Sequence, residues 1–408
     1  MNKLLVILLS LLIGEAVAQQ QKKVVYIIVD GIAADVIEQA NTPNLTEISR
    51  QGTYMRAFQG GEVGAYNESP TISAVGYNNV LTGVWYNKHN VPDNDIKSPN
   101  YNYPSIFRLL KDAYPQKKIG VFSSWQDNRT KLIGEGLAQT GNIKMDYAFD
   151  GLELDTNNYP HDKKRDFMAA IDEAVSKSAA ETIEEKAPDL SWVYLEYTDD
   201  MGHMYGDSPQ YTVAIEKMDK QVGRIWQAIK KRQASSKEEW MIIITTDHGR
   251  DEATGQGHGG QSFRQRSGWI ISNKTLNNSY AKLLYPSAVD ILPTIAQFMD
   301  ISIPENTQRE LDGIKLIGEV AIAKPQVNYF RKQLDISWMP LKENGEVKIW
   351  VSTTNNQRKG EKDTYQLMGT FPLKNKNAVI SVKDLPSSFY KIVLETNQNM
   401  VNRWVGNP

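Results

Sequence analysis

Short apolar runs without polar alternation recur between residues 24 and 271, and stretches with helical periodicity separate them. Runs of this kind predict strands that are covered on both faces, and the helices between them predict right-handed crossovers. We therefore expect an α/β architecture with a largely parallel central sheet. The predicted strands are Val24–Val29, Lys118–Phe122, Ser191–Tyr197, Trp240–Thr245 and Gly268–Ile271.

Helix signals lie between these strands. Thr42-Pro43-Asn44-Leu45 has a capping residue followed by proline in the first turn, and Gly52 is placed to end that helix. Two longer segments, Pro209–Lys231 and Pro286–Met299, are also predicted to be helical.

The pattern changes after about Val320. Several short segments alternate or run apolar at close spacing, with Asn, Gly, Lys and Pro between them. Such a series without helices predicts a small β-sandwich, of the fibronectin-III-like kind. These segments are Ile336–Trp338, Val347–Val351, Tyr365–Met368, Ala378–Val382 and Tyr390–Leu394.

The first residues resemble an export signal. Lys3 precedes an apolar stretch from Leu4 to Ile13, and Ala16-Val17-Ala18 supplies small residues for cleavage. We therefore predict a signal peptide at residues 1–18, a catalytic domain at 19–319 and the β-sandwich at 320–408. The chain has no cysteine, which excludes disulfides and a lipid-modified cysteine. A periplasmic or secreted protein without a stable membrane anchor is expected.

The formal net charge is only −2, with acidic and basic residues mixed along the chain. That balance indicates no basic surface that would bind a nucleic-acid duplex or an anionic membrane. The expected ligand is therefore a small molecule that is recognised locally.

Five histidines are present, and three of them lie in cassettes that also contain aspartates or glycines. The cassettes are Asp199–His203, Asp247–Gly249 and Gly257–Gly260, and Asp30 ends the first predicted strand. Three carboxylates and three imidazoles suit two zinc-like ions that still have room for a substrate. Because half of these candidate ligands are imidazoles, zinc is the favoured metal, and manganese or another divalent metal is the alternative.

The acidic cassettes lie where predicted strands end. Asp30 follows the first strand, Asp199 the third and Asp247 the fourth. Because ligands of open α/β sheets gather at the carboxyl ends of strands, we expect these acids to meet at one edge.

A hydrolase of this kind also needs a nucleophile. Ser73 lies at the expected start of a helix that ends near Gly83, where free backbone N–H groups and the helix dipole favour an anion. Ser73 is our candidate nucleophile, and Thr71 is the alternative.

These elements and their order resemble the alkaline phosphatase superfamily, specifically its type I phosphodiesterase/nucleotide pyrophosphatase branch, from about Lys22 to Met299. The resemblance implies an alkaline-phosphatase-like fold and hydrolysis of phosphodiester or pyrophosphate bonds through a phosphoseryl intermediate. It also implies that Asn94 hydrogen-bonds a nonbridging phosphoryl oxygen. It places one zinc among Asp30, Ser73, Asp247 and His248, and the other among Asp199, His203 and His258.

The chain departs from the family around the nucleophile. Family members usually carry threonine where Ser73 stands, and Asn-His often follows where this chain reads Gly76-Tyr77. Tyr77 is kept as a candidate substrate contact.

A second departure concerns charge. Related phosphate monoesterases hold a monoester dianion with a Lys-x-Arg pair, but here Gln126 takes the place of the lysine and Arg129 is displaced. Arg129 is kept as a candidate substrate contact. The lost cation favours a singly charged diester phosphoryl group. The expected substrate is a small-molecule phosphodiester or a nucleotide.

Two other functions stay open: a phosphomonoesterase of the same superfamily, and a noncatalytic binding protein whose C-terminal sandwich contacts a glycan or a protein. The complete set of ligands argues against the second, because a binding module has no need of them. The resemblance also implies that sulfatases need a formylglycine precursor in a Pro-x-Arg context, which Ser73 lacks.

Overall fold

The computed structural model describes residues 20–283 and 285–406. The predicted signal peptide, residues 1–18, lies outside these residues. No helix among the described residues is long and apolar enough to cross a membrane. The domain boundary at residue 320 stays a prediction.

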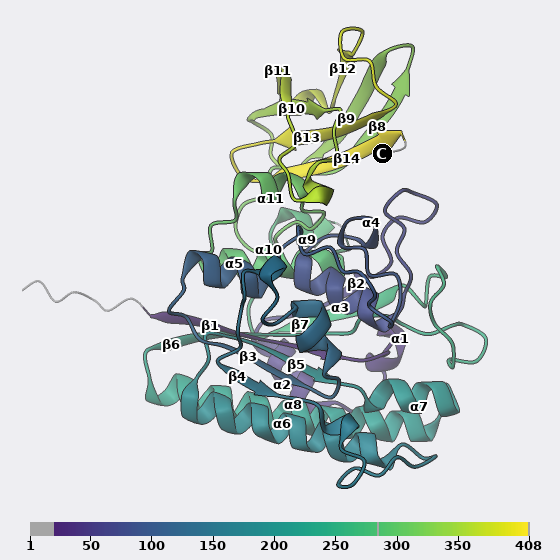
Figure 1. Cartoon of the computed structure of the whole chain (residues 1–408), viewed down its shortest axis with the longest axis vertical. Coiled ribbons are helices and arrows are strands. Elements are labelled where there is room, and N and C mark those ends of the chain that lie inside the picture. The colour runs from purple at the N-terminus through teal and green to yellow at the C-terminus, as the bar shows by residue number, and fades with distance from the viewer. Residues whose placement is uncertain (1–19, 284, 407–408) are drawn as a thin grey trace, which may run out of the picture.

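A seven-stranded sheet forms the centre of the larger part of the molecule, in the order β2-β7-β6-β1-β5-β3-β4 (Figure 1). The five strands from β6 to β4 are parallel, whereas β7 runs antiparallel to β6, and β2 runs antiparallel to β7. The sheet is therefore mixed, and β2 and β4 were not predicted. The strands are β1 (Gln21–Val29), β2 (Thr53–Phe58), β3 (Ile119–Ser123), β4 (Tyr147–Phe149), β5 (Leu190–Leu195), β6 (Glu238–Thr245) and β7 (Ser267–Ser272).

Side chains of β1 alternate between two apolar cores, because successive residues of a strand point to opposite faces of the sheet. Val25 and Ile27 pack with the core that contains α2, α6 and α8. Tyr26 and Ile28 pack with the core that contains α3, α5 and α10. These helices cover the two faces (Figure 1). They are α2 (Pro43–Gln51), α3 (Ser73–Thr82), α5 (Ile106–Ala113), α6 (Asp166–Lys186), α8 (Pro209–Ser235) and α10 (Ile291–Phe298).

The third predicted strand was too long. It ends at Leu195, and Tyr197 is the first residue of α7 (Tyr197–Tyr205). The cause is Asp172 in α6, whose carboxylate accepts hydrogen bonds from the backbone N–H groups of Glu196 (3.1 Å) and Tyr197 (2.8 Å). An anion at this position turns the chain from a strand into a helix. The remaining helices are α1 (Ala34–Ile37), α4 (Tyr86–His89), α9 (Ser279–Leu283) and α11 (Glu305–Glu310).

Two antiparallel sheets form the C-terminal part, with strand orders β11-β10-β13-β14 and β12-β9-β8. The predicted fold class, a sheet flanked by helices with an all-β region after it, is confirmed. Sequence analysis missed the first and last of these strands. The strands are β8 (Ile322–Phe330), β9 (Gln333–Pro340), β10 (Glu346–Ser352), β11 (Gln366–Pro372), β12 (Asn377–Ser381), β13 (Phe389–Glu395) and β14 (Met400–Gly406).

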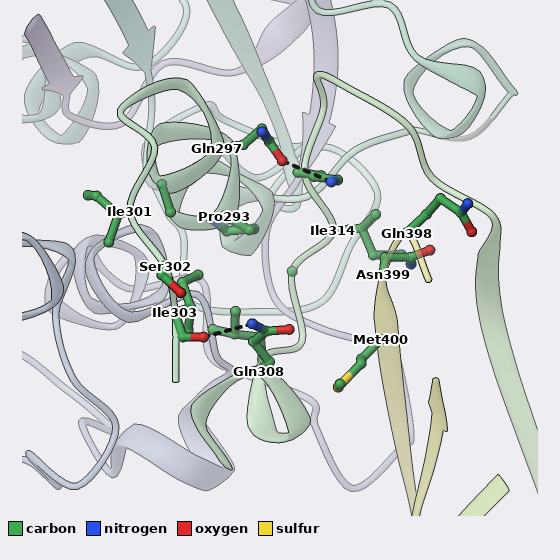
Figure 2. A pocket seen from close by; sticks show the side chains of 14 residues that line it. Pro293, Gln297, Ile301, Ser302, Ile303, Gln308, Ile314, Gln398, Asn399 and Met400 are labelled. Carbon is green, nitrogen blue, oxygen red and sulfur yellow. Dashed lines mark hydrogen bonds between the residues drawn. The ribbon is translucent and has the colours of Figure 1, made fainter. Parts of the chain in front are cut away.

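A pocket of about 670 Å³ lies where α10 and the segment before α11 meet the turn between β13 and β14 (Figure 2). Gln308 Nε2 donates to the backbone oxygen of Ile303 (2.7 Å), and Gln297 Oε1 accepts from Lys315 Nζ (2.9 Å). Asn399 Oδ1 accepts from the backbone N–H of Ala321 (3.0 Å). These amide groups are thus used in holding the junction together.

Candidate metal centre and active site

Three neighbouring parallel strands bring the predicted acids to one edge of the sheet. Asp30 directly follows β1, Asp247 lies two residues after β6, and Asp199 lies in the first turn of α7, just beyond β5. Because β6, β1 and β5 are adjacent, their carboxyl ends carry these residues into a shared space.

The first group of ligand atoms surrounds the buried ring of His248. Its Nε2 lies 3.3 Å from Asp30 Oδ1, 3.2 Å from Asp247 Oδ2 and 3.4 Å from Ser73 Oγ. Both carboxylate oxygens are buried without a hydrogen-bond partner among the described residues. His248 Nδ1 lies 3.0 Å from the backbone oxygen of Gly249 and is placed to donate to it, which leaves the Nε2 lone pair for a cation.

The electrostatics of this group favour a positive charge. Burial lowers the pKa of His248, but the attraction of Asp247 and Asp30 outweighs burial and raises that pKa to about 9. Burial and the repulsion of Asp30 raise the pKa of Asp247. A divalent cation would satisfy these carboxylates and leave the imidazole neutral.

The second group of ligand atoms lies at the rim. Asp199 Oδ2 lies 3.2 Å from His203 Nε2, and that nitrogen lies 3.0 Å from His258 Nε2. His258 Nδ1 is placed to donate to the backbone oxygen of Thr71 (2.9 Å), so its Nε2 also keeps a lone pair. Burial and the repulsion of His248 lower the pKa of His258 to about 4, which keeps this imidazole neutral.

The two groups are close neighbours. The rings of His248 and His258 stack with centroids 3.7 Å apart. Asp199 has a carboxylate oxygen within 4.8 Å of the candidate ligand atoms in each group. Carboxylate oxygens and imidazole nitrogens without other partners fit two divalent ions, and this donor set suits zinc.

Tyrosine hydroxyls hold the carboxylate of Asp30 from behind. Tyr77 donates a very short hydrogen bond to Asp30 Oδ2, and Tyr194 donates to the same oxygen at 2.7 Å. Both rings are buried. Tyr77, a predicted substrate contact, thus has its hydroxyl engaged by Asp30, although the residue also lines the cavity described below.

Ser73 is the first residue of α3, as predicted, and Gly83 caps the end of that helix. The backbone N–H of Ala74 donates to Asn94 Oδ1 (2.9 Å). The amide NH₂ of Asn94 is then available to donate to a ligand oxygen. Thr71, the alternative nucleophile, donates from its hydroxyl to the backbone oxygen of Gly260 (2.7 Å).

An open cavity of about 790 Å³ is lined by Ser73 together with Asp30 and Asp199. Its far wall combines apolar surfaces with the charged side chains of Glu153, Arg165 and Glu196. Arg129 is not among the lining residues. It pairs with Asp150 (2.6 and 2.8 Å) and with Glu135. The other lining residues are Tyr77, Asn94, Trp125, Leu154, His161, Phe167, Met168 and Tyr194.

Sequence analysis missed three residues of this region: Tyr194, Arg165 and Arg250. Tyr194 belongs to an apolar run that predicts a strand, so its hydroxyl gave no separate signal. Arg165 lies in a polar loop far from every cassette in the sequence. Arg250 directly follows Asp247-His248-Gly249, and this adjacency is the one signal that was available.

One family model matches more than half of the chain. The model of the family described as type I phosphodiesterase / nucleotide pyrophosphatase matches residues 24–277. Venom phosphodiesterase CdcPDE of Crotalus durissus collilineatus is 24% identical over 249 residues, which cover 57% of this chain and 27% of that protein. Human ectonucleotide pyrophosphatase/phosphodiesterase family member 5 is 24% identical over 248 residues, which cover 59% of this chain and 47% of that protein. The chain thus spans less than half the length of either relative.

Among solved structures, the phosphonate monoester hydrolase of Agrobacterium radiobacter superposes with a TM-score of 0.52 at 13% identity. The superposition covers 94% of this chain and 89% of that one. Similarity at this level of identity concerns the fold alone.

Proposed function

The chain belongs to the type I phosphodiesterase/nucleotide pyrophosphatase family, and from this premise we propose that it is a two-metal phosphodiesterase. The proposal rests on one observation above all. Unpartnered oxygens of Asp30 and Asp247 and the free nitrogen of His248 converge beside the Ser73 hydroxyl. Asp30, Ser73, Asp247 and His248 are proposed to hold one ion, and Asp199, His203 and His258 the other.

The proposed reaction follows from what the residues can do. Bound divalent ions would lower the pKa of the Ser73 hydroxyl and neutralise negative charge on the phosphoryl group and the departing oxygen. Ser73 Oγ loses its proton to solvent and forms a bond to phosphorus while the opposite P–O bond breaks, and the departing alcohol or nucleotide takes up a proton in exchange. Water then cleaves the phosphoseryl ester and releases the monoester. Asn94 donates to a nonbridging oxygen throughout.

The charge of the cavity supports a diester rather than a monoester. Among the described residues that line it, Arg165 is the one Lys or Arg side chain. Arg165 Nε lies 2.6 Å from Asp200 and its Nη2 lies 2.9 Å from Glu196. A monoester dianion therefore meets no unpaired cation on this wall, whereas a diester brings only one negative charge.

Removing each of the two candidate hydroxyls in a separate variant tests which residue is the nucleophile. Ser73→Ala should lower kcat for bis(p-nitrophenyl) phosphate by at least ~10³-fold, as loss of a catalytic nucleophile does. Thr71→Val is the matched control and should retain much more activity. Metal content measured on both proteins separates loss of the nucleophile from loss of an ion.

The opposite pattern, with an active Ser73→Ala and an inactive Thr71→Val, would make Thr71 the nucleophile. Faster turnover of p-nitrophenyl phosphate than of the diester by the unmodified protein would favour the phosphomonoesterase. A metal-free, inactive protein would favour the binding protein.

A periplasmic or secreted location belongs to the same proposal. Two of the related sequences come from venoms, which are secreted fluids. Contact of the C-terminal sheets with a glycan or a protein stays a prediction.

A further inference from the structure

Arg250 is fully buried and contacts two of the three segments that carry the acidic ligands. Its Nε donates to the backbone oxygen of Gly31 (3.0 Å), next to Asp30. Its Nη2 donates to the backbone oxygen of Asp199 (2.8 Å) and, over a very short distance, to Asp199 Oδ1. Arg250 itself belongs to the third segment, because it follows the ligands Asp247 and His248 by three and two residues.

Two glycines make room for this guanidinium group. A Cβ atom on Gly31 would lie 2.6 Å from Arg250 Nη2, and a Cβ on Gly202 would overlap the same nitrogen even more closely. Gly202 is the glycine of the Asp-x-x-Gly-His motif. The small residues of these motifs are thus fitted to Arg250, which indicates a specific role rather than general charge balance.

The contacts divide the two oxygens of Asp199 between different partners. Oδ1 is bonded to Arg250, and it is also the oxygen that lies 3.9 Å from His248 Nε2. Oδ2 faces His203 Nε2 at 3.2 Å. The guanidinium thus occupies one acceptor position of Oδ1, and Oδ2 is the oxygen that faces His203 and His258.

We propose that Arg250 is a positioning residue that reserves Asp199 for the cation bound by His203 and His258, and so keeps the two cation sites separate. This inference rests on the proposed function, because it assumes two bound ions. Lysine could not take the same role, since its single ammonium group cannot reproduce the fixed fork of donors that spans Gly31 and Asp199.

Zinc titration of the metal-free full-length chain in competition with a chromophoric chelator tests this role without any activity assay. Arg250→Met should weaken one of two zinc sites roughly 10- to 100-fold, the usual effect of losing a residue that orients a metal ligand. The other site should stay within a factor of about three. In a His203→Ala background, which already lacks the weakened site, Arg250→Met should leave the remaining site unchanged.

Arg264→Met is the matched control. Arg264 is also largely buried and pairs with Asp35 (2.9 Å) and Asp207 (2.8 Å), but it contacts no proposed ligand. This variant should keep both zinc affinities. Equal weakening of both sites by Arg250→Met, or no weakening, would overturn the role of Arg250 while leaving the proposed function intact. An unmodified protein that binds no zinc would overturn both.

A measurement on the unmodified chain covers the case in which Arg250→Met does not fold. In crystals grown with zinc, Asp199 should bind one ion through Oδ2 while Oδ1 stays on Arg250. An Asp199 carboxylate that bridges both ions, with Arg250 displaced, would contradict the inference.

Discussion

Two phenol groups hold one oxygen of Asp30, so that its other oxygen faces the proposed first cation site. Replacing Tyr77 and Tyr194 together by phenylalanine removes both donors to Asp30 Oδ2. We expect zinc affinity at that site to fall about 10- to 100-fold in the double variant, because residues behind a ligand set its orientation. Chelator competition measures this loss.

Tyr26→Phe is the matched control for that change. Tyr26 lies on β1, four residues before Asp30, and its buried hydroxyl has no hydrogen-bond partner among the described residues. Its removal should leave zinc affinity unaltered. If the control weakened zinc as much as the double variant, the phenol groups would act through packing rather than through hydrogen bonds.

At the residue scale, the sequence locates the proposed ligands more readily than the groups behind them. Asp30, Asp247 and His248 stand at the ends of apolar runs, a pattern that can be read locally. The partners of a side chain depend on segments distant in sequence, which no periodicity records. Tyr77 and Arg129 illustrate this. The polar group of Tyr77 is engaged by Asp30, 47 residues away, and that of Arg129 by Asp150, 21 residues away.

At the element scale, α3 approaches the end of β6 through a glycine. A Cβ atom on Gly76 would lie 2.6 Å from the backbone oxygen of Asp247 and 2.7 Å from its Cβ. Gly76→Ala should therefore destabilise the protein by about 1–3 kcal/mol through overpacking, although alanine favours helices.

Urea denaturation measures that change, and zinc titration should show weaker binding beside Asp247. An increase in stability, as helix propensity alone predicts, would show that α3 can move away without cost. The control is Gly64→Ala, because a Cβ on Gly64 meets nothing within 4 Å. Gly64 has a φ of +72°, which Gly76 in α3 does not share, so any loss of stability in this control is the backbone cost of alanine without a steric contact.

The elements themselves were predicted well where burial is continuous. The five predicted strands of the central sheet all form, because both of their faces are covered and their apolar runs are uninterrupted. β2 is mostly half-buried and contains Arg56, and β4 has only three residues, so neither gave a continuous apolar run. Tyr197 continued an apolar run, but the carboxylate of Asp172 starts a helix there, and only the tertiary structure brings α6 to that point.

At the scale of the whole molecule, buried ion pairs join the C-terminal sheets to the catalytic part. Lys391 in β13 contacts Glu310 of α11 (2.6 Å) and Asp363 (2.8 Å), and all three side chains are almost fully buried. Lys391→Met should lower the free energy of unfolding by about 3–5 kcal/mol, since it leaves buried carboxylates without their cation.

Lys342→Met provides the comparison for that variant. The Lys342–Glu319 pair is exposed, with side chains 33% and 72% accessible, so its loss should change stability by less than about 1 kcal/mol. Chemical denaturation of both variants gives the two values. If both variants lost the same free energy of unfolding, the buried ion pairs of Lys391 would stabilise the molecule no more than an exposed pair does.

The central claim is that distant acids and imidazoles meet at one edge of the sheet to hold two divalent ions beside Ser73. Anomalous diffraction at the zinc edge, from crystals of the full chain grown with zinc, tests it most directly. The account predicts two peaks per chain, one among Asp30, Ser73, Asp247 and His248 and one among Asp199, His203 and His258. A single peak, or none at these residues, would contradict it.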